Sequence, residues 1–169
     1  LHNNVNRGLA GIGDIFAAPY REGCFGGCLY RPLTLATFAV EWAIAPNSPA
    51  IGHWMNVLWY TATALLLYNT LLRLLHGRSP VLAFAATLLF VAHPVHTEVV
   101  ANVKGRDEIV SLLGSLAALY LSLKAFYEGK NGLNAAAAVL FFLALLSKEN
   151  AITFLAIVPL TYWFFTKAS

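Results

Sequence analysis

The residues best suited to chemistry lie in three short polar segments that interrupt long apolar blocks. The first segment is Tyr30-Arg-Pro-Leu33, the second runs from His93 to Glu108, and the third is Ser147-Lys-Glu-Asn150. Ionisable side chains within apolar surroundings of this kind are costly to place in a membrane and are functional candidates by default. Fixed cations there suit an anionic substrate, whereas histidine and carboxylate side chains suit proton transfer.

In the second segment, His93, His96 and Glu98 lie beside Pro94 at the expected end of a helix. The His-x-x-His spacing is compatible with a divalent metal site, but it is far less specific than a complete zinc signature. We therefore assign His96 and Glu98 to acid–base catalysis or substrate orientation, with His93 as a further candidate. No cofactor is expected, and metal binding is the alternative interpretation.

Each charged candidate also has a structural interpretation. Arg31 alone can extend its guanidinium to the lipid head groups. Arg106 and Asp107 can belong to an ordinary solvated turn, and Lys148 and Glu149 can form the tip of a helical hairpin. These alternatives stay open for every residue taken singly.

The composition indicates an integral membrane protein. Of the 169 residues, 59% are hydrophobic and 11% are charged, whereas soluble domains have about 25% charged residues. So few charges cannot cover the surface of a water-soluble globule. The formal net charge is only +3, and no run of basic residues resembles a nucleic-acid-binding patch, so no nucleic-acid partner is expected.

The apolar blocks predict an all-α fold. The block 33–45 is too short to cross about 30 Å of hydrocarbon at about 1.5 Å per residue. It suits an interfacial helix whose polar stripe of Thr34, Thr37 and Glu41 faces outward. Further apolar helices are expected over 53–75, 81–93, 107–127, 133–146 and 151–165, with Asp107 capping the third of these. We divide the chain into an outer loop with interfacial amphipathic helices (1–50) and a bundle of about five spanning helices (51–169).

Alternation of these spans places the three polar segments on one side of the membrane. If the first span runs from outside to inside, that side is the outer one. The positive-inside rule favours this orientation once the N-terminal stretch is set aside, because the inner turns then carry five lysine and arginine residues against three outside. Since several helices are short for a bilayer, we expect a recessed polar pocket on the outer side.

The strings YRPLT, FVAHPVHTEVVANVKGRDE and LLSKENAIT resemble the TMTC family of transmembrane O-mannosyltransferases, which target cadherins. Similar bacterial membrane proteins carry tetratricopeptide repeats. More distantly, the order of elements is similar to protein O-mannosyltransferases and lipid A aminoarabinose transferases, which share the GT-C fold. The resemblance covers nearly the whole chain.

The resemblance implies a mechanism and assigns residues to it. Such enzymes bind a polyprenyl or dolichyl phosphate sugar at the outer membrane face. An acidic residue deprotonates the acceptor hydroxyl, which attacks the anomeric carbon with inversion while basic residues stabilise the departing lipid phosphate. Arg31 and Lys148 match the basic positions of the first and third motifs. His96 and Glu98 match the second-loop motif, and the weaker candidates are His93, Arg106, Asp107 and Glu149.

The chain departs from the family pattern near its beginning. The acidic catalytic motif and the helix before it are expected to precede Leu1, because Asp14 and Glu22 are the only carboxylates ahead of the YRPL motif and neither belongs to an acidic pair. We therefore expect an N-terminal membrane fragment that is inactive alone and lacks the repeats. Cys24 and Cys28 either form a disulfide in an oxidising compartment or are small apolar residues of a glycine-rich turn.

The sequence thus predicts a GT-C-like polytopic helical bundle that transfers a hexose, with mannose as a candidate, from the lipid phosphate to a protein or glycan hydroxyl. It would lie in the plasma membrane of a bacterium or the endoplasmic reticulum membrane of a eukaryote. One alternative is a polytopic transporter or flippase, but the chain shows no internal repeat of the kind that transporters have. A non-catalytic membrane scaffold is the other alternative.

Overall fold

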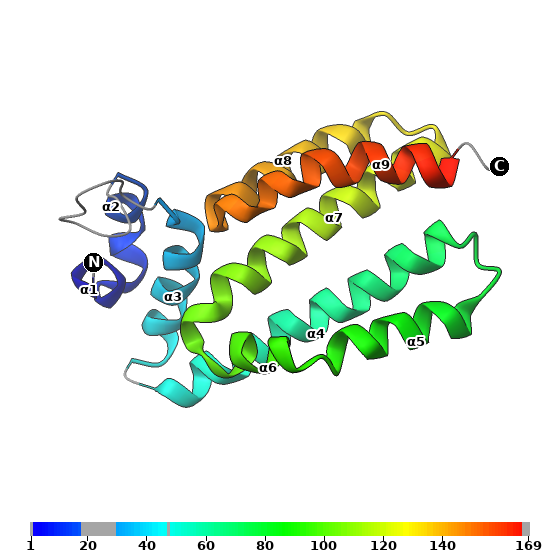
Figure 1. The fold of residues 1–169 in the computed structure, drawn as a ribbon. Helices are drawn as coiled ribbons and strands as arrows, with labels where there is room; N and C mark the ends of the chain where they lie inside the picture. Colours follow the sequence, from blue (N-terminus) through cyan, green and yellow to red (C-terminus); the bar gives the residue numbers. More distant parts are fainter. Residues whose placement is uncertain (1, 18–29, 47, 167–169) are drawn as a thin grey trace.

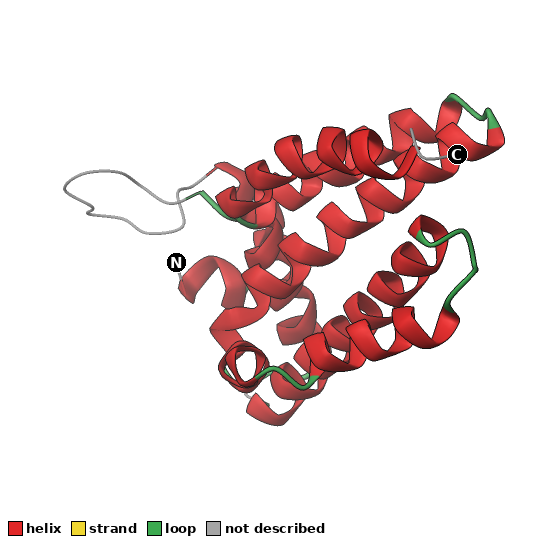
Figure 2. Ribbon diagram, turned by 45° about the vertical axis from the view of Figure 1, so that its right-hand side comes forward, coloured by secondary structure: helices red, strands yellow, loops and turns green. Residues whose placement is uncertain are grey.

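The computed structural model describes residues 2–17, 30–46 and 48–166. These residues form α-helices and short 3-10 helices and, within those ranges, no strand (Figure 1). Figure 2 shows that the loops are confined to turns between helices. The N-terminal part contains α1 (His2–Asn6), η1 (Gly8–Gly11), α2 (Ile12–Ala17) and α3 (Pro32–Ile44), and the rest contains α4 (Pro49–Leu74), α5 (Pro80–Val91), α6 (Pro94–Ala101), η2 (Val103–Gly105), α7 (Arg106–Glu128), α8 (Gly132–Ser147), η3 (Glu149–Thr153) and α9 (Phe154–Thr166). Cys24 and Cys28 lie outside the described residues.

Proline sets where four of the helices begin. Pro32, Pro49, Pro80 and Pro94 each occupy the first position of a helix. Proline suits that position because its missing N–H is not needed there and its fixed φ matches a helix. Helix α7 ends at Gly129, which has a φ of 65° and closes the helix in the left-handed conformation that glycine tolerates.

The long helices pack around α7. Helix α8 runs back along α7 after a short turn, α4 packs against another side of α7, and α5 pairs with α4 (Figure 1). A Cβ added at Gly114 would lie 3.0 Å from the Ala144 Cβ, so the glycine allows α7 and α8 to approach closely. The apolar core between these helices contains Leu74, Leu116, Leu119, Leu123 and Phe154.

Helices α1, α2 and α3 form a small separate cluster at one end of the bundle. Its core contains Ile15, Leu35 and Ala39, with Val5 and Ile12 packed against it. In Figure 1 this cluster lies at the left, where α7 begins and α8 ends, while the α4–α5 and α7–α8 turns lie at the opposite end. The exposed Arg7 and Asp14 form an ion pair within it.

The predicted orientation of α3 is wrong. Its polar stripe was expected to face outward, but Thr34 is fully buried and Glu41 pairs with the buried Arg106. The stripe turns inward because α7 and the end of α8 supply polar partners for it. Asp107 is likewise not the cap of α7. The helix begins one residue earlier, at Arg106, and Asp107 lies in its first turn.

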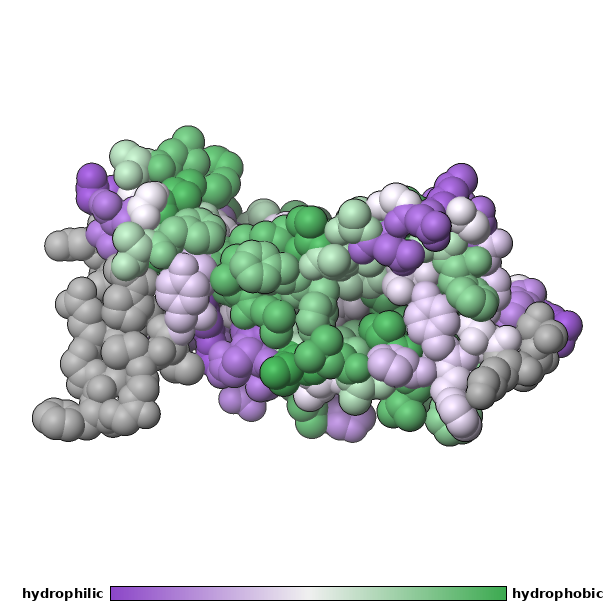
Figure 3. All heavy atoms as spheres, turned by 90° about the horizontal axis from the view of Figure 1, so that it is seen from above, coloured by the Kyte–Doolittle hydropathy of each residue, from purple (hydrophilic) through white to green (hydrophobic). Residues whose placement is uncertain are grey.

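One segment is long and apolar enough to cross a membrane. Residues Val103–Glu128 form a helical stretch of 26 residues that contains an 18-residue window with a mean hydropathy of 1.8. The pair α5 and α6 also qualifies if it is counted as one span, although the two helices are bent by 60° at Pro94. Large apolar side chains are exposed on the outside of the bundle, among them Val81, Leu89 and Trp163. In Figure 3 apolar residues cover the middle of one face and polar residues lie toward both of its ends.

Candidate functional site

The three polar segments of the sequence meet at the end of the bundle where α7 begins. The first segment supplies Arg31 at the start of α3, the second supplies Asp107 and Glu108 in the first turn of α7, and the third supplies Lys148, between α8 and η3, and Glu149, the first residue of η3. These five residues are called the ion cluster below. Their ion pairs join residues up to 118 positions apart in the chain.

Arg31 is the centre of the ion cluster. Its guanidinium donates from Nε to Glu149 Oε2 at 3.2 Å and from Nη2 to Glu149 Oε1 at 2.6 Å. Its third nitrogen, Nη1, donates to Asp107 Oδ2 at 2.5 Å. The Arg31 and Asp107 side chains are only 12% and 11% exposed, whereas Glu149 is 59% exposed. Glu149 is therefore the partner that can leave Arg31 most easily.

Lys148 is the second cation of the cluster. Its ammonium forms a short contact with Glu108 and lies 4.0 Å from Asp107 Oδ2. Its side chain is 14% exposed. Two cations thus face three carboxylates, and the cluster carries a net charge of −1 as it stands.

Hydrogen bonds between neutral groups align the elements beneath the cluster. Thr34 Oγ1 lies 2.9 Å from Ser147 Oγ, and Ser147 Oγ also lies 3.4 Å from the Asp107 carbonyl oxygen. Both hydroxyl side chains are buried. Buried polar groups of this kind are costly unless paired, so they fix α3 against the ends of α7 and α8.

Arg106 is enclosed by protein groups and is not accessible to a substrate. Its side chain is fully buried, and its guanidinium donates to Asn56 Oδ1 and to the Gly52 carbonyl oxygen, each at 3.0 Å. It also lies 4.2 Å from the centre of the Phe38 ring. Nη1 is 2.7 Å from Glu41 Oε1, an ion pair without the alignment of a hydrogen bond. Arg106 therefore ties α3 and α4 to the start of α7.

The charge environment shifts the pKa of two members of the ion cluster. Burial alone would lower the pKa of Arg31, but the hydrogen bonds and charges of Glu149 and Asp107 together raise it above the ordinary value. The hydrogen bond from Arg31 lowers the pKa of Glu149, assisted by a backbone hydrogen bond and the nearby cations. Both groups are therefore held in their charged forms.

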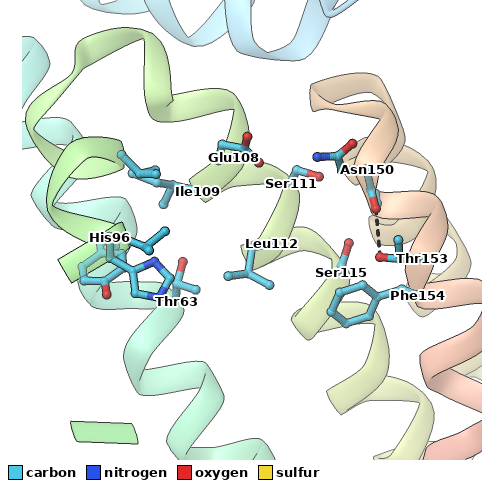
Figure 4. Close-up of a pocket in the computed structure, with 14 residues that line it drawn as sticks. Thr63, His96, Glu108, Ile109, Ser111, Leu112, Ser115, Asn150, Thr153 and Phe154 are labelled. Atoms are coloured by element: carbon cyan, nitrogen blue, oxygen red, sulfur yellow. Dashed lines mark hydrogen bonds between the residues drawn. The ribbon is translucent and has the colours of Figure 1, made fainter. Parts of the chain in front are cut away.

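A cavity of about 380 Å³ lies next to the ion cluster, between α4 and α6 on one side and η3 on the other (Figure 4). Its apolar wall includes Ile109, Leu112 and Phe154. Polar side chains line it from α4, α6, α7 and η3: Thr63, His96, Glu108, Ser111, Ser115, Asn150 and Thr153. Glu108 belongs to both the cavity and the ion cluster, so the two are continuous.

Two polar groups in the cavity are candidates for contact with a ligand. Ser115 is 1% exposed, and its Oγ has no hydrogen-bond partner among the described residues. An unsatisfied buried hydroxyl calls for an explanation, and a bound polar ligand supplies one. His96 projects from α6 opposite Ser115 (Figure 4) and is held by the rings of Phe90 and Tyr60, whose centres lie 4.3 and 5.7 Å from its own.

The structure separates the residues singled out from the sequence into two groups. It brings Arg31, Asp107, Lys148 and Glu149 together and places His96 in the adjoining cavity. The others lie elsewhere: His93, just before α6, and Glu98, on α6, are exposed, and Arg106 is buried. Across the described ranges, the Glu98 side chain makes no hydrogen bond or ion pair.

Metal ligation has no support in the described part of the chain. There, no group of three or more histidine, cysteine or carboxylate residues is close enough to hold an ion. The His93 and His96 rings lie 5.9 Å apart, and His93 Nδ1 accepts a hydrogen bond from the Val95 N–H.

Sequence reasoning missed three residues of the cavity. Glu108, Ser111 and Ser115 recur at spacings of three and four residues and therefore share one face of α7. Small residues such as serine on one face of a membrane helix usually serve helix packing, a role that Gly114 fulfils here against α8. The coincidence of a carboxylate with the two serines on one face was the signal that could have identified this wall.

Comparison with known proteins supports a relationship to O-mannosyltransferases. The chain is 36% identical over 124 residues to the protein O-mannosyl-transferase F38B6.6 of Caenorhabditis elegans, covering 73% of this chain and 17% of that protein. It is 32% identical over 147 residues to human TMTC4, covering 76% and 20%. It is 35% identical over 89 residues to human TMTC3, covering 53% and 9%. The chain thus spans at most a fifth of the length of these relatives, and it matches no protein-family model and no solved structure.

Proposed function

We propose, on the premise that this chain is homologous to the TMTC protein O-mannosyl-transferases, that it forms part of a membrane enzyme transferring mannose from a dolichyl or polyprenyl phosphate to a hydroxyl group of a protein. The fold we propose is the membrane bundle of a GT-C glycosyltransferase. The membrane would be that of the endoplasmic reticulum in a eukaryote or the plasma membrane in a bacterium. The convergence of three distant polar segments beside one cavity is the observation that carries this proposal.

The exterior of the bundle supports placement in a membrane. Leu82, Phe84 and Leu88 on α5 and Phe142 and Leu155 on the other side of the bundle are all more than half exposed. Apolar surface of this extent is unfavourable in water and favourable in hydrocarbon. In our proposal the helices α4, α5, α7, α8 and α9 cross the bilayer, the shorter ones with help from their polar turns.

The ion cluster is suited to a lipid phosphate. A phosphate that displaces the exposed Glu149 carboxylate would meet the fork of N–H donors that Arg31 presents to Glu149 now. Lys148, whose side chain is 14% exposed, would supply a second positive charge. In a site of low water content, such fixed cations stabilise the charge that grows on the leaving phosphate.

The cavity would then hold the sugar and the end of the acceptor. The acceptor oxygen forms a bond to the anomeric carbon, the bond from that carbon to the phosphate oxygen breaks, and the hydroxyl proton passes to a carboxylate base of the enzyme. We assign sugar orientation to the Ser115 hydroxyl and to His96, which face each other across the cavity. Glu98, which is exposed on α6 outside the cavity lining, is assigned to contact the acceptor.

The test uses the whole enzyme of which this chain is proposed to form part, in membranes, with dolichyl phosphate mannose carrying a radiolabel and an acceptor protein. Arg31→Gln should raise the KM for the donor by about tenfold to a hundredfold, the value of one to two charge-assisted hydrogen bonds. Glu149→Gln removes the competing carboxylate and should leave donor binding unchanged or tighter. Arg7→Gln, at an exposed ion pair outside the site, is the matched control.

The opposite responses of the two variants distinguish a phosphate site from a structural ion pair. If Arg31→Gln and Glu149→Gln lowered transfer equally, the pair would serve stability alone and the phosphate assignment would be wrong. A protein that inserts normally but transfers no mannose with any acceptor would point to the scaffold or transporter alternatives.

A further inference from the structure

The end of the bundle opposite the ion cluster is positively charged. The cations Arg73, Arg78, Lys124 and Lys130 gather there with one carboxylate, Glu128, and these five residues are called the basic end. Their net charge is +3. The other end carries a net charge of −1 from Arg31, Lys104, Arg106 and Lys148 against Glu41, Glu98, Asp107, Glu108 and Glu149. One end of the bundle is therefore positively charged relative to the other, and the proposed sugar transfer gives the positive end no role.

The basic end contains a cavity of about 370 Å³ in which Arg73 is held in place. Its guanidinium carbon lies 5.0 Å from the centre of the Tyr120 ring, and Nη2 donates a hydrogen bond to the Tyr120 hydroxyl at 3.5 Å. Glu128 is 3.7 Å from Nη1, too far for a strong hydrogen bond. Across the described residues, Arg73 thus makes one long side-chain hydrogen bond although a guanidinium has five N–H donors. It has donors to offer to an anionic ligand.

His76 reaches the same cavity from a strained backbone position. The Gly77 N–H bonds the Leu72 carbonyl oxygen at 2.9 Å and the His76 N–H bonds the Arg73 carbonyl oxygen at 3.1 Å, a Schellman motif that ends α4. Such a motif places a left-handed residue after the helix, usually glycine. Here that residue is His76, with a φ of 51°. The His76 imidazole occupies a position where glycine is easier, and its Nε2 lies 3.5 Å from the Tyr127 hydroxyl.

A second cavity of about 330 Å³ adjoins the first through His76. Its polar wall contains Arg78, and its apolar wall contains Leu75, Phe164 and Phe165. Arg78 is exposed and makes no side-chain ion pair within the described ranges. The two cavities share His76, and each contains one arginine, Arg73 in the first and Arg78 in the second. The second cavity also has an apolar surface from α9, which continues the apolar exterior of the bundle.

We propose that the basic end binds the phosphodiester head group of an anionic phospholipid. Arg73 and Arg78 would contact the phosphate from either side of His76, and an acyl chain would lie on Phe164 and Phe165. A lipid fits better than a free phosphate because the second cavity has an apolar wall that a soluble anion would not use. This proposal needs the bundle to lie in a membrane, but it is independent of sugar transfer, so the transfer assay can fail while this one succeeds.

The probes are phosphatidylglycerol, phosphatidylcholine and inorganic phosphate, added to the detergent-solubilised protein, with retained lipid counted by native mass spectrometry. Phosphatidylglycerol should be retained more than phosphatidylcholine. Arg73→Gln and Arg78→Gln should each weaken its retention about fivefold, which corresponds to ~1 kcal/mol per cation at a membrane surface. Lys104→Gln is the matched control, because Lys104 is an exposed cation at the opposite end without an ion pair among the described residues.

Three results would overturn the proposal. Equal retention of the two lipids would remove the preference for an anionic head group, and equal losses from Lys104→Gln and Arg78→Gln would reduce it to general charge attraction. Displacement of phosphatidylglycerol by inorganic phosphate would indicate a free-anion site. The variant His76→Gly tests the site without the risk of misfolding, because glycine relieves the backbone strain at this position. It should keep or raise the thermal midpoint while it lowers lipid retention, and unchanged retention would exclude His76.

Discussion

The buried Arg106 offers a sharp test of how the start of α7 is held. Replacement by methionine removes the charge and both side-chain hydrogen bonds while keeping a long apolar stem. The acceptors Asn56 Oδ1 and the Gly52 carbonyl oxygen would each lose a donor at 3.0 Å, and Glu41, whose side chain is 14% exposed, would lose its counter-ion at 2.7 Å. The largest cost is the carboxylate left without a partner.

The magnitude follows from known behaviour of buried ion pairs. Breaking such a pair by removing one partner costs about 3–5 kcal/mol. Arg106→Met should therefore lower the free energy of unfolding by about that amount. Glu41→Leu should cost about 2–4 kcal/mol, because the arginine left behind keeps two hydrogen bonds. The double variant leaves no buried charge and only the two unpaired acceptors, each worth about 1–2 kcal/mol, so it should cost less than the two single changes together.

The assay is unfolding of the detergent-solubilised protein, followed by the helical circular dichroism signal. A coupling of at least about 1 kcal/mol between positions 41 and 106 is expected from the double-mutant cycle, because the two single costs together exceed the double cost by that much even at their limits. Additive effects would show that the two charges do not interact. A loss below about 1 kcal/mol for Arg106→Met would show that water reaches the site, and our description of α3, α4 and α7 as locked together would then be wrong.

Two further predictions concern helix packing and pH. Gly114→Ala should destabilise the bundle by about 1–3 kcal/mol, since its Cβ would press on Ala144 at 3.0 Å, whereas Gly132→Ala, which meets nothing within 4 Å, should be neutral or slightly stabilising in the same unfolding assay. Because Arg31 lowers the pKa of Glu149, the contact between the two side chains should be fully present above the ordinary carboxyl pKa. It should be lost only as the pH falls through the lowered pKa. A carboxyl titration by NMR with a midpoint at or above the ordinary pKa would contradict this prediction.

Much of the candidate site could be predicted from the sequence, because apolar blocks of helical length force the polar turns between them to alternate between two ends. That rule placed Arg31, Asp107 and Lys148 at one end, and the structure brings them within ion-pair distance. The homology to O-mannosyltransferases confirms the resemblance read from the same motifs. The all-helical fold agrees with the prediction for the described ranges, while a bundle of five spans stays a prediction, since one or two spans meet the criteria of length and hydropathy.

Other parts could not be predicted, because they depend on partners far away in the chain. The polar stripe of α3 reads as solvent-facing until Arg106 and Ser147 are known to lie beneath it. Likewise, Arg106 reads as part of an exposed turn, and nothing local shows that Asn56 and Gly52 of α4 enclose it. Periodicity defines a face of a helix but does not say which neighbour covers that face.

The separation of the ion-cluster partners along the chain determines when this site can exist. Arg31 can pair with Glu149 only after the chain has grown by 118 residues, and Thr34 can contact Ser147 only after it has grown by 113. During synthesis the N-terminal segment emerges first, so α3 has no anchor from the third motif until α4, α5, α7 and α8 have been made. The ion cluster therefore cannot form until the third motif has been made, and that motif then joins the three segments.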